Sequence, residues 1–292
     1  MPRAGIVTVV GKPNVGKSTL LNRIVGQKLS ITSPKPQSTR DRIVGILTTG
    51  DAQMVILDTP GLLDPKYPLQ EAMRGTAIRA LEEADVIIYL ADATEGAPPS
   101  LIEAAKLGKN PSAPVIVALN KSDALPPTRR DELAAHGNGT LVSALTGEGI
   151  PELMERVTQR LPESPFLYPE DEISTQPVRF FVAELVRETV LEQLHDEVPY
   201  AVAVQVEEYR EGRSPLYIRA VIYVERDSQK AIIIGSKGAQ IRKIGESARK
   251  KIETFVGEQV YLDLWVKVLA NWRKNPGSLS RFGYQLATGK SK

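Results

Sequence analysis

The sequence predicts an α/β protein of two domains: a P-loop domain with a mostly parallel sheet flanked by helices, and a smaller α+β domain after it. The chain has 292 residues, more than the roughly 100 to 200 of a usual single domain. Apolar, β-rich runs alternate with helical patterns in its first part, which is typical of a parallel sheet covered by helices. A glycine-rich segment, GKPNVGKS at 11–18, follows the first of these runs.

The first domain is expected to cover residues 1–162. A helical pattern at 150–161 closes this unit, and the prolines of the segment 163–178 indicate a linker. Its strands are predicted at the apolar runs 6–10, 43–47, 54–57, 86–90, 115–119 and 141–142.

The second domain is expected at 179–292, with a different order of elements. Trp265 and Leu269 are expected in the core formed by its last strand. The pattern predicts a helix at 180–195, followed by two strands at 201–206 and 217–224 that are joined as a hairpin. An apolar run at 232–234 and a glycine-bracketed loop at 235–238 come next. A helix at 239–255 and a strand at 260–269 complete the domain.

Composition excludes several classes of site and suggests one kind of partner. The chain has no cysteine, which excludes disulfides, thiolate metal sites and cysteine nucleophiles. It has neither a secretory signal pattern nor an apolar run near the ~20 residues that span a bilayer, so a cytoplasmic protein is expected. Residues 226–292 hold 14 Lys or Arg and five Asp or Glu, a net charge of +9, which leaves −7 for the rest. This asymmetry indicates an anionic partner for the C-terminal part.

The segment 11–18 fits GxxxxGKS and lies between a predicted strand and a predicted helix, which is the context of a phosphate-binding loop. Its glycines let backbone N–H groups face the phosphates, Lys17 reaches the β- and γ-phosphates, and the hydroxyl of Ser18 binds Mg²⁺. The nucleotide-binding residues expected here are Gly11, Lys12, Pro13, Asn14, Val15, Gly16, Lys17, Ser18 and Thr19.

A second motif follows the predicted strand at 54–57. A carboxylate at the carboxyl end of a strand, here Asp58, can face the nucleotide and hold Mg²⁺, and Gly61 can offer its N–H to a γ-phosphate. The same letters alone would also fit an ordinary turn. Behind a P-loop they predict a nucleotide contact formed by Asp58, Thr59, Pro60, Gly61 and Leu62.

The base is predicted to be guanine. The carboxylate of Asp123 would accept hydrogen bonds from N1–H and the 2-amino group, which adenine lacks. Asn120 would brace the pocket, and the stem of Lys121 would lie along the ring. The full set expected here is Asn120, Lys121, Ser122 and Asp123, with Ser143, Ala144 and Leu145 directing backbone N–H groups at the guanine oxygen.

The loop Gly235-Ser236-Lys237-Gly238 matches the GxxG loop of a KH domain, where glycines let a sugar-phosphate chain pass close to the backbone. The bare string would also fit a simple turn. The preceding apolar run, the basic segment 249–251 and the strand order resemble the type II KH arrangement. Arg242 and Lys243 are therefore expected to contact RNA.

No acidic residue follows Asp263. Basic residues interleaved with rings suit single-stranded RNA, because charges follow phosphates and rings stack on bases; a basic tail without this role is the alternative. The expected contacts are Arg273, Lys274 and Arg281, with Lys267, Lys290 and Lys292 as further charges and Trp272, Phe282 and Tyr284 as rings.

The ordered motifs resemble a translation-factor-type GTPase, and Gln37-Ser38-Thr39-Arg40-Asp41 narrows this to the Era family of bacterial GTPases, which the whole chain resembles. The resemblance implies that 37–41 lie in the first switch, with Thr39 reaching Mg²⁺ and the γ-phosphate. Lys17, Thr39 and Gly61 then form the expected catalytic set. The expected metal ligands are Ser18, Thr39 and Asp58.

Leu62 stands where Ras-like enzymes place a water-orienting glutamine. Leucine cannot orient water, so the resemblance implies that backbone, metal or another group holds it; a binding-only switch is the alternative. In related GTPases a P-loop asparagine helps to bind K⁺. Asn14 therefore suggests potassium-stimulated hydrolysis, against a purely structural role in the loop.

The resemblance implies a monomeric enzyme that hydrolyses GTP to GDP and phosphate, binds the 3′ region of 16S rRNA and acts in assembly of the small (30S) ribosomal subunit. It also implies a peripheral contact with the inner face of the cell membrane. The main alternative is a membrane-associated signalling GTPase whose KH-like unit binds proteins. A P-loop ATPase is the third possibility.

Overall fold

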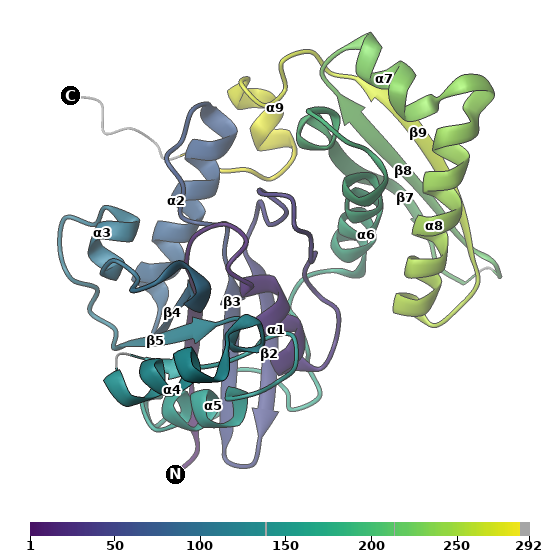
Figure 1. Ribbon diagram of the computed structural model, residues 1–292. Helices are drawn as coiled ribbons and strands as arrows, with labels where there is room; N and C mark the ends of the chain where they lie inside the picture. Colours follow the sequence, from purple (N-terminus) through teal and green to yellow (C-terminus); the bar gives the residue numbers. More distant parts are fainter. Residues whose placement is uncertain (138, 213, 287–292) are drawn as a thin grey trace, which may run out of the picture. The chain divides into compact units, whose positions relative to one another are not determined.

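The structure is a computed structural model that describes residues 1–286 apart from 138 and 213. Lys290 and Lys292 of the expected basic tail lie outside the described residues. The chain divides into two units, which are described separately (Figure 1). The first comprises Met1–Lys66 and Gln70–Thr175, and the second comprises Tyr67–Leu69 and the chain from Gln176 onward.

The first unit alternates strands and helices as predicted. Its strands are β1 (Arg3–Val10), β2 (Ile43–Thr49), β3 (Ala52–Asp58), β4 (Val86–Asp92), β5 (Val115–Asn120) and β6 (Thr140–Leu141). Its helices are α1 (Lys17–Val25), α2 (Pro68–Glu83), α3 (Leu101–Ala105), α4 (Pro127–His136) and α5 (Ile150–Thr158), with 3₁₀ turns η1 (Ala93–Glu95) and η2 (Ser122–Ala124).

The six strands form one sheet in the order β2-β3-β1-β4-β5-β6, in which only the β2–β3 pair is antiparallel. Parallel strands bring their carboxyl ends to the same edge of a sheet. The loops that follow β1, β3, β4 and β5 therefore begin side by side, after Val10, Asp58, Asp92 and Asn120. This edge is where the site forms.

Helices cover both faces of the sheet. On one face, the hydroxyl of Thr8 in β1 donates to the carbonyl of Ala80 in α2 at 2.7 Å, and Ala80 also packs against Val44 and Ile46 of β2. Side chains alternate along a strand, so Gly45 between them faces the other side. A Cβ there would lie 2.8 Å from Leu21 of α1, and the glycine lets α1 lie close to the sheet.

The segment 163–178, expected as a linker, is partly packed on the first unit, which extends to Thr175. The amide oxygen of Gln53 accepts the backbone N–H groups of Leu167 and Tyr168 at 2.8 and 2.9 Å. The carbonyl of Ile173 accepts the N–H of Ile46. These bonds satisfy polar groups along β2 and β3, which a sequence pattern does not reveal.

The second unit is a three-stranded sheet with α6, α7 and α8 packed on one face (green to yellow in Figure 1). The strand order β7-β8-β9 combines an antiparallel β7–β8 pair with a parallel β8–β9 pair. Its elements are α6 (Val178–Gln193), η3 (Val198–Ala201), β7 (Ala203–Arg210), β8 (Leu216–Val224), α7 (Asp227–Ile234), η4 (Ser236–Gly238), α8 (Ala239–Val256), β9 (Val260–Val268) and α9 (Pro276–Arg281).

Two expectations about tryptophans are wrong. Trp265, expected in the core of the last strand, is 52% exposed, while Leu269 is half-buried. Trp272, expected as a ring for stacking on bases, is fully buried and donates its indole N–H to the carbonyl of Ala201 at 2.8 Å. The apolar run 232–234 lies at the end of helix α7.

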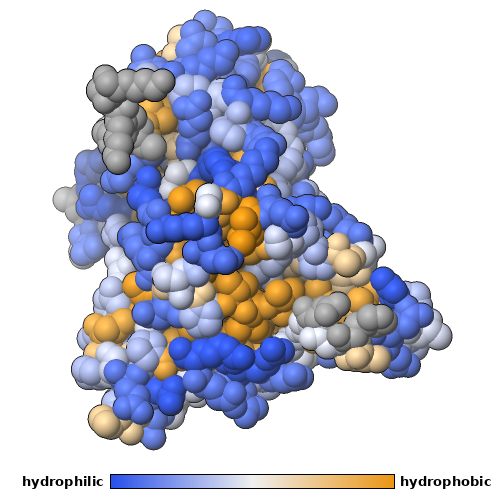
Figure 2. Space-filling view, turned by 90° about the vertical axis from the view of Figure 1, so that its left-hand side faces the viewer, coloured by the Kyte–Doolittle hydropathy of each residue, from blue (hydrophilic) through white to orange (hydrophobic). Residues whose placement is uncertain are grey.

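One face of the molecule carries a hollow with apolar side chains where α3 and β5 lie (Figure 2). It has a volume of about 430 Å³ and is lined by Leu101, Ile102, Val115 and Val117, among others. No residue predicted to be functional lies in it. Within the described part of the chain, no helix is both long and apolar enough to cross a membrane.

Candidate nucleotide site and nucleic-acid groove

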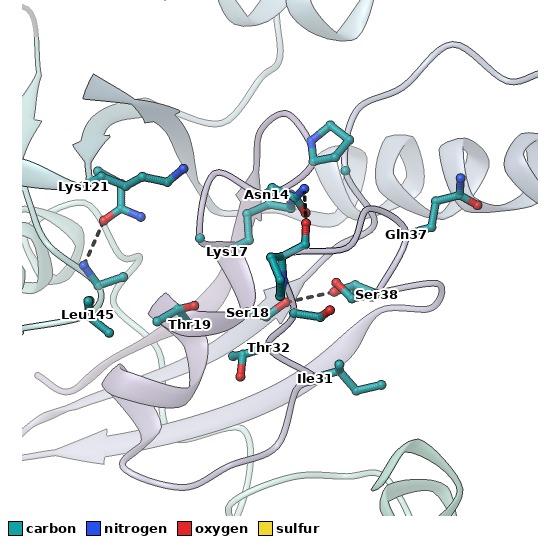
Figure 3. Close-up of a pocket in the computed structure, with 18 of the residues that line it drawn as sticks. Asn14, Lys17, Ser18, Thr19, Ile31, Thr32, Gln37, Ser38, Lys121 and Leu145 are labelled. Atoms are coloured by element: carbon teal, nitrogen blue, oxygen red, sulfur yellow. Dashed lines mark hydrogen bonds between the residues drawn. The ribbon is translucent and has the colours of Figure 1, made fainter. Parts of the chain in front are cut away.

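A cavity of about 420 Å³ opens at the carboxyl edge of the first sheet. Figure 3 shows Asn14, Lys17, Ser18 and Thr32 in the middle of the site, Gln37 and Ser38 toward one end, and Lys121 and Leu145 at the other end. Gly61 and Asp123 also line it. The motifs predicted separately from the sequence therefore meet around one cavity.

The P-loop glycines are required by close contacts. A Cβ on Gly11 would lie 2.2 Å from the carbonyl oxygen of Leu90, and one on Gly16 would lie 2.2 Å from the side-chain nitrogen of Asn120. Gly16 also has φ +102°, where side chains are strained. The loop can thus lie against β4 and the base-binding segment only with glycine at both positions.

Lys17 is the buried cation of the site. Its ammonium group donates to the carbonyls of Gly11 and Lys12 at 3.2 and 2.9 Å. Burial lowers the pKa of Lys17 to about 8, although the carboxylate of Asp58 opposes this shift. A phosphate anion would strongly stabilise the charged ammonium group of Lys17, because it would replace the solvation that the group has lost through burial.

The three expected metal ligands lie together. Oγ of Ser18 is 2.9 Å from Oγ1 of Thr39 and donates to Oδ2 of Asp58 at 2.7 Å. Thr39 is 3.4 Å from the same carboxylate oxygen. Burial raises the pKa of Asp58, against the opposing effects of Lys17 and of hydrogen bonds from Ser18, Ser30 and Thr39.

Asp58 retains one uncompensated oxygen. Its Oδ1 is buried and has no hydrogen-bond partner among the described residues. A cation or an ordered water at this position would supply what the protein does not. Ser30, which the motifs did not indicate, donates to Oδ2 at 2.7 Å.

The segment after Asp58 lies against the P-loop. The backbone of Gly61 is so close to Pro13 that an added Cβ would be 2.7 Å from its nitrogen. The N–H of Leu62 donates to the carbonyl of Gly11, and its side chain is only 6% exposed. Thr59 donates to the carbonyl of Val9 at 2.8 Å. Leu62 therefore belongs to the core under the loop.

The base-binding residues form a network. Asn120 accepts the N–H of Ala144 at 2.9 Å and donates to the carbonyl of Val15 at 2.7 Å, so it joins two loops. Oγ of Ser143 donates to the carboxylate of Asp123 at 2.5 Å. Ser122 is buried and donates to Glu148. These bonds hold Asp123 at the rim of the cavity.

Asp92 is a site residue that the sequence analysis missed. Its Oδ2 accepts the ammonium group of Lys121 at 2.5 Å. It ends β4 and is the register partner of Asn120 in β5. An acidic residue at the end of a strand was the available signal, as it was for Asp58.

Asn14 connects the P-loop to the first-switch segment. Its φ is +63°, and its side-chain nitrogen donates to the carbonyl of Pro34 at 2.8 Å (Figure 3). The amide oxygen of Asn14 and the backbone carbonyls of the switch segment are the ligand types that suit a hard monovalent cation.

In the second unit, the predicted GxxG loop connects α7 to α8. Gly235, Lys237 and Gly238 all have positive φ, at +71°, +50° and +79°. A Cβ on Gly235 would lie 2.7 Å from that of Gln240. The loop ends at the N-terminus of the 18-residue helix α8, where free N–H groups favour phosphate.

A groove of about 530 Å³ runs from this loop between α8 and β9. It combines a charged wall with an apolar floor, and the lack of a side chain at Gly245 keeps it open. The lining residues are Gly238, Ile241, Arg242, Gly245, Glu246 and Arg249 from α8 and its cap, and Val260, Tyr261, Leu262 and Leu264 from β9.

Several predicted RNA contacts lie elsewhere. Arg273 pairs with Glu225 at 2.5 Å, and Arg281 donates to the hydroxyl of Tyr223 at 2.7 Å. Neither lines the groove, and neither do Lys243 and Lys274. Within the basic segment 249–251, Lys251 pairs with Glu188 and Glu192 of α6. The structure therefore brings the GxxG loop, through Gly238, and Arg242 together at the groove, whereas Lys243, Arg273, Lys274 and Arg281 do not line it.

Known proteins support both units. Residues 6–121 match the sequence model of a family described as 50S ribosome-binding GTPase, and residues 197–273 match that of the KH domain. GTPase Era of Carboxydothermus hydrogenoformans is 42% identical over 291 residues, 97% of this chain and 98% of that protein. The chain belongs to the Era family of GTPases. GTPase Era of Synechocystis is likewise 42% identical, over 97% of this chain and 93% of that protein.

Solved Era structures agree with this assignment. A variant of Era from Aquifex aeolicus bound to GDP and AlF₄⁻ superposes with a TM-score of 0.90 at 42% identity, covering 97% of this chain and all of that one. Era bound to MgGDPNP and nucleotides 1506–1542 of 16S ribosomal RNA gives the same score and identity over 98% of this chain and all of that one. The predicted fold, family and enzyme class are confirmed: the protein is a guanine-nucleotide-binding GTPase.

Proposed function

We propose that this GTPase binds the 3′ region of 16S rRNA through its KH groove and acts in assembly of the small ribosomal subunit, with the bound nucleotide controlling the RNA affinity. One observation carries the proposal. A complete guanine-nucleotide cavity and a GxxG groove occur in one chain that is 42% identical to an Era whose structure contains that RNA. We propose the same residues for the nucleotide and RNA sites as the motifs predicted.

The residues present fit a magnesium ion. Mg²⁺ takes hard oxygen ligands and is usually bound by one or two protein groups together with substrate phosphates. Ser18, Thr39 and Asp58 offer two hydroxyls and a carboxylate within 3.4 Å of one another, and Oδ1 of Asp58 lacks a protein partner among the described residues. When bound, the ion would neutralise charge on the β- and γ-phosphates.

Hydrolysis then depends on charge stabilisation and on positioning. Lys17 holds the phosphates from a desolvated position, where electrostatic interactions are strong. Gly61 lines the cavity and lies against Pro13 of the P-loop, so we assign its backbone N–H to the γ-phosphate. The attacking water must be held by backbone, by an ion or by another group, because the side chain of Leu62 is buried and apolar.

Asn14 suggests the ion. We infer that K⁺ binds beside the phosphates through Asn14 and stimulates hydrolysis. The test compares the GTPase rate in potassium and sodium buffers at saturating Mg²⁺, for the wild type and for Asn14→Ala. Stimulation by potassium that the variant loses supports the inference, and equal rates in both buffers for the wild type contradict it.

The groove accounts for RNA binding through known chemistry. A KH groove holds about four nucleotides, with the backbone at the GxxG loop and the bases against an apolar floor. Gly235 and Gly238 allow the close approach, the N-terminus of α8 and Lys237 attract phosphate, and Arg242 lies in the groove. Arg273 and Arg281 could join only by leaving their present partners.

Filter binding with RNA of the 16S 3′ sequence tests the proposal. We expect an affinity that falls steeply with salt and that Gly238→Asp, which places a carboxylate at the phosphate site, abolishes. A control variant, Gly212→Asp, is made in the β7–β8 turn, where nothing lies within 4 Å of an added Cβ. Equal binding by Gly238→Asp and the wild type would contradict the proposal.

A vesicle-binding measurement beside the RNA measurement addresses the membrane-associated alternative, a signalling GTPase. A basic second unit could also contact anionic lipid, and such a contact at the inner face of the membrane is compatible with a monomeric cytoplasmic enzyme. Binding to anionic vesicles without binding to RNA would favour the alternative.

A further inference from the structure

The second sheet presents rings on the face opposite α6, α7 and α8. Along β9 the side chains alternate, so Val260 and Val266 enter the core while Tyr261 and Trp265 are 59% and 52% exposed. We call this surface the ring face and define it by Arg210, Tyr217, Arg219, Tyr261, Asp263 and Trp265. Large exposed rings gathered on one surface mark binding sites more often than single scattered ones do.

The ring face is held rigidly. The rings of Tyr217 and Tyr261 stack with centroids 5.8 Å apart and planes 12° from parallel. The guanidinium of Arg210 lies 4.8 Å over the ring of Tyr217. Tyr217 and Arg219 donate to the carboxylate of Asp263 at 2.9 and 3.0 Å. A ligand that stacks here would lose little affinity to ordering of side chains.

Asp263 links this array to the tryptophan. Burial alone would raise the pKa of Asp263, but hydrogen bonds from Trp265, Arg219 and Tyr217 lower it below its ordinary value. The carboxylate therefore stays ionised at neutral pH.

The charged side chains of the ring face are paired with one another or with Glu208, so a ligand cannot be recognised there by charge alone. Arg210 pairs with Glu208 at 2.5 Å, and Arg219 pairs with Glu208 and Asp263. An anionic membrane would find no excess of positive charge here. Recognition must rely on the ring surfaces, and every nucleobase has a flat π face that stacks on such rings irrespective of sequence.

The ring face is continuous with the groove. Tyr261 lines the groove and also stacks on Tyr217 of the ring face. β9 is an edge strand. No further strand of the sheet therefore lies between the groove on one side of β9 and the ring face on the other. Trp265 lies four residues along the strand from Tyr261, about 13 Å at a rise of ~3.3 Å per residue.

We propose that single-stranded RNA leaving the groove passes around the edge of β9 and continues on the ring face, where Tyr261 and Trp265 each stack on an unpaired base. The site takes nucleobases without a preferred sequence. This inference rests on the proposed RNA-binding function.

RNAs of two lengths distinguish the contribution of the ring face to binding from that of the groove. An unstructured RNA of about four nucleotides fills a KH groove alone, whereas one of about ten extends beyond it. Dissociation constants for both are measured with the wild type, Trp265→Ala and Trp265→Phe. The matched control is Val268→Ala, which changes an exposed apolar residue of the same strand that carries no ring.

We expect Trp265→Ala to weaken binding of the longer RNA about tenfold and to leave the shorter RNA unaffected, with substantial rescue by Trp265→Phe and no effect of Val268→Ala. Wild-type affinity of Trp265→Ala for the longer RNA would overturn the inference, while loss of binding by Gly238→Asp would still support the groove. If the wild type bound neither RNA, both proposals would fail.

Because Trp272 is fully buried, quenching of tryptophan fluorescence by the longer RNA should come from Trp265. Quenching that persists in Trp265→Phe would count against stacking at that position.

Discussion

The carboxylate of Asp92 accepts a hydrogen bond from the ammonium group of Lys121 at 2.5 Å, and the side chain of Asp92 is only 7% exposed. Its other oxygen accepts the N–H and the hydroxyl of Thr94 at 3.0 and 2.7 Å, so the carboxylate is fixed on both sides. Lys121 is the residue whose stem is expected to cover the guanine ring. We therefore expect Asp92 to position the base through Lys121.

Asp92→Asn should weaken GDP binding about fivefold to tenfold, because the charge-assisted bond to Lys121 is lost. A fluorescent GDP analogue gives the dissociation constant. Glu95→Gln is the control, because Glu95 pairs with Lys12 at an exposed position, 57% and 54% accessible, where ion pairs contribute little. Equal effects of the two variants would show that Asp92 has no special role.

Nucleotide binding should take up protons near pH 8. The pKa of Lys17 is about 8, so the group loses its charge as the pH rises through 8, and phosphate restores that charge by raising the pKa again. At pH 8 we expect uptake of about half a proton per GDP, measured calorimetrically in buffers of different ionisation enthalpy. Lys17→Arg, which stays charged, should show almost none. Uptake that is unchanged in this variant would assign the proton to another group.

Gly16→Ala should abolish nucleotide binding. The added methyl would lie 2.2 Å from the side-chain nitrogen of Asn120, so it would displace the residue that joins the P-loop to the base-binding loop. Gly26→Ala, at the other end of α1, has a similar positive φ but nothing within 4 Å. It should cost about 1 kcal/mol of unfolding free energy and leave the affinity for GDP unchanged. Comparable affinities of the two variants would contradict this role of Gly16.

Leu62→Gln should not raise the rate of hydrolysis. The side chain of Leu62 is in the core, 6% exposed, packed with Val10 and Leu81, and is not directed at the γ-phosphate position. Burying an amide there should lower the free energy of unfolding by about 1 to 3 kcal/mol. Turnover at saturating GTP and chemical denaturation check both parts. A faster enzyme would show that the segment rearranges to present this residue to water.

The nucleotide motifs could be predicted because each one follows a parallel strand, and the sheet brings such strand ends together without further information. Asp92 belongs to no motif, and its role arises from register with Asn120 across β4 and β5. Ser30 reaches Asp58 from a loop without regular structure. Neither contact follows from spacing along the chain.

The tryptophans illustrate a different limit. In β9, Val260, Leu262, Leu264 and Val266 alternate with Tyr261, Asp263, Trp265 and Lys267. This alternation by itself indicates an exposed Trp265. The burial of Trp272 depends on the carbonyl of Ala201, 71 residues away. Local composition around Trp272 could not show this.

The most direct test of the account is the dissociation constant for RNA of the 16S 3′ sequence, measured with the protein loaded with a non-hydrolysable GTP analogue and with GDP at fixed salt. The account predicts that RNA binds at least about tenfold more tightly in one nucleotide state, and by linkage that RNA changes the affinity for nucleotide by the same factor. Equal RNA affinity in both states would contradict control of RNA binding by the nucleotide.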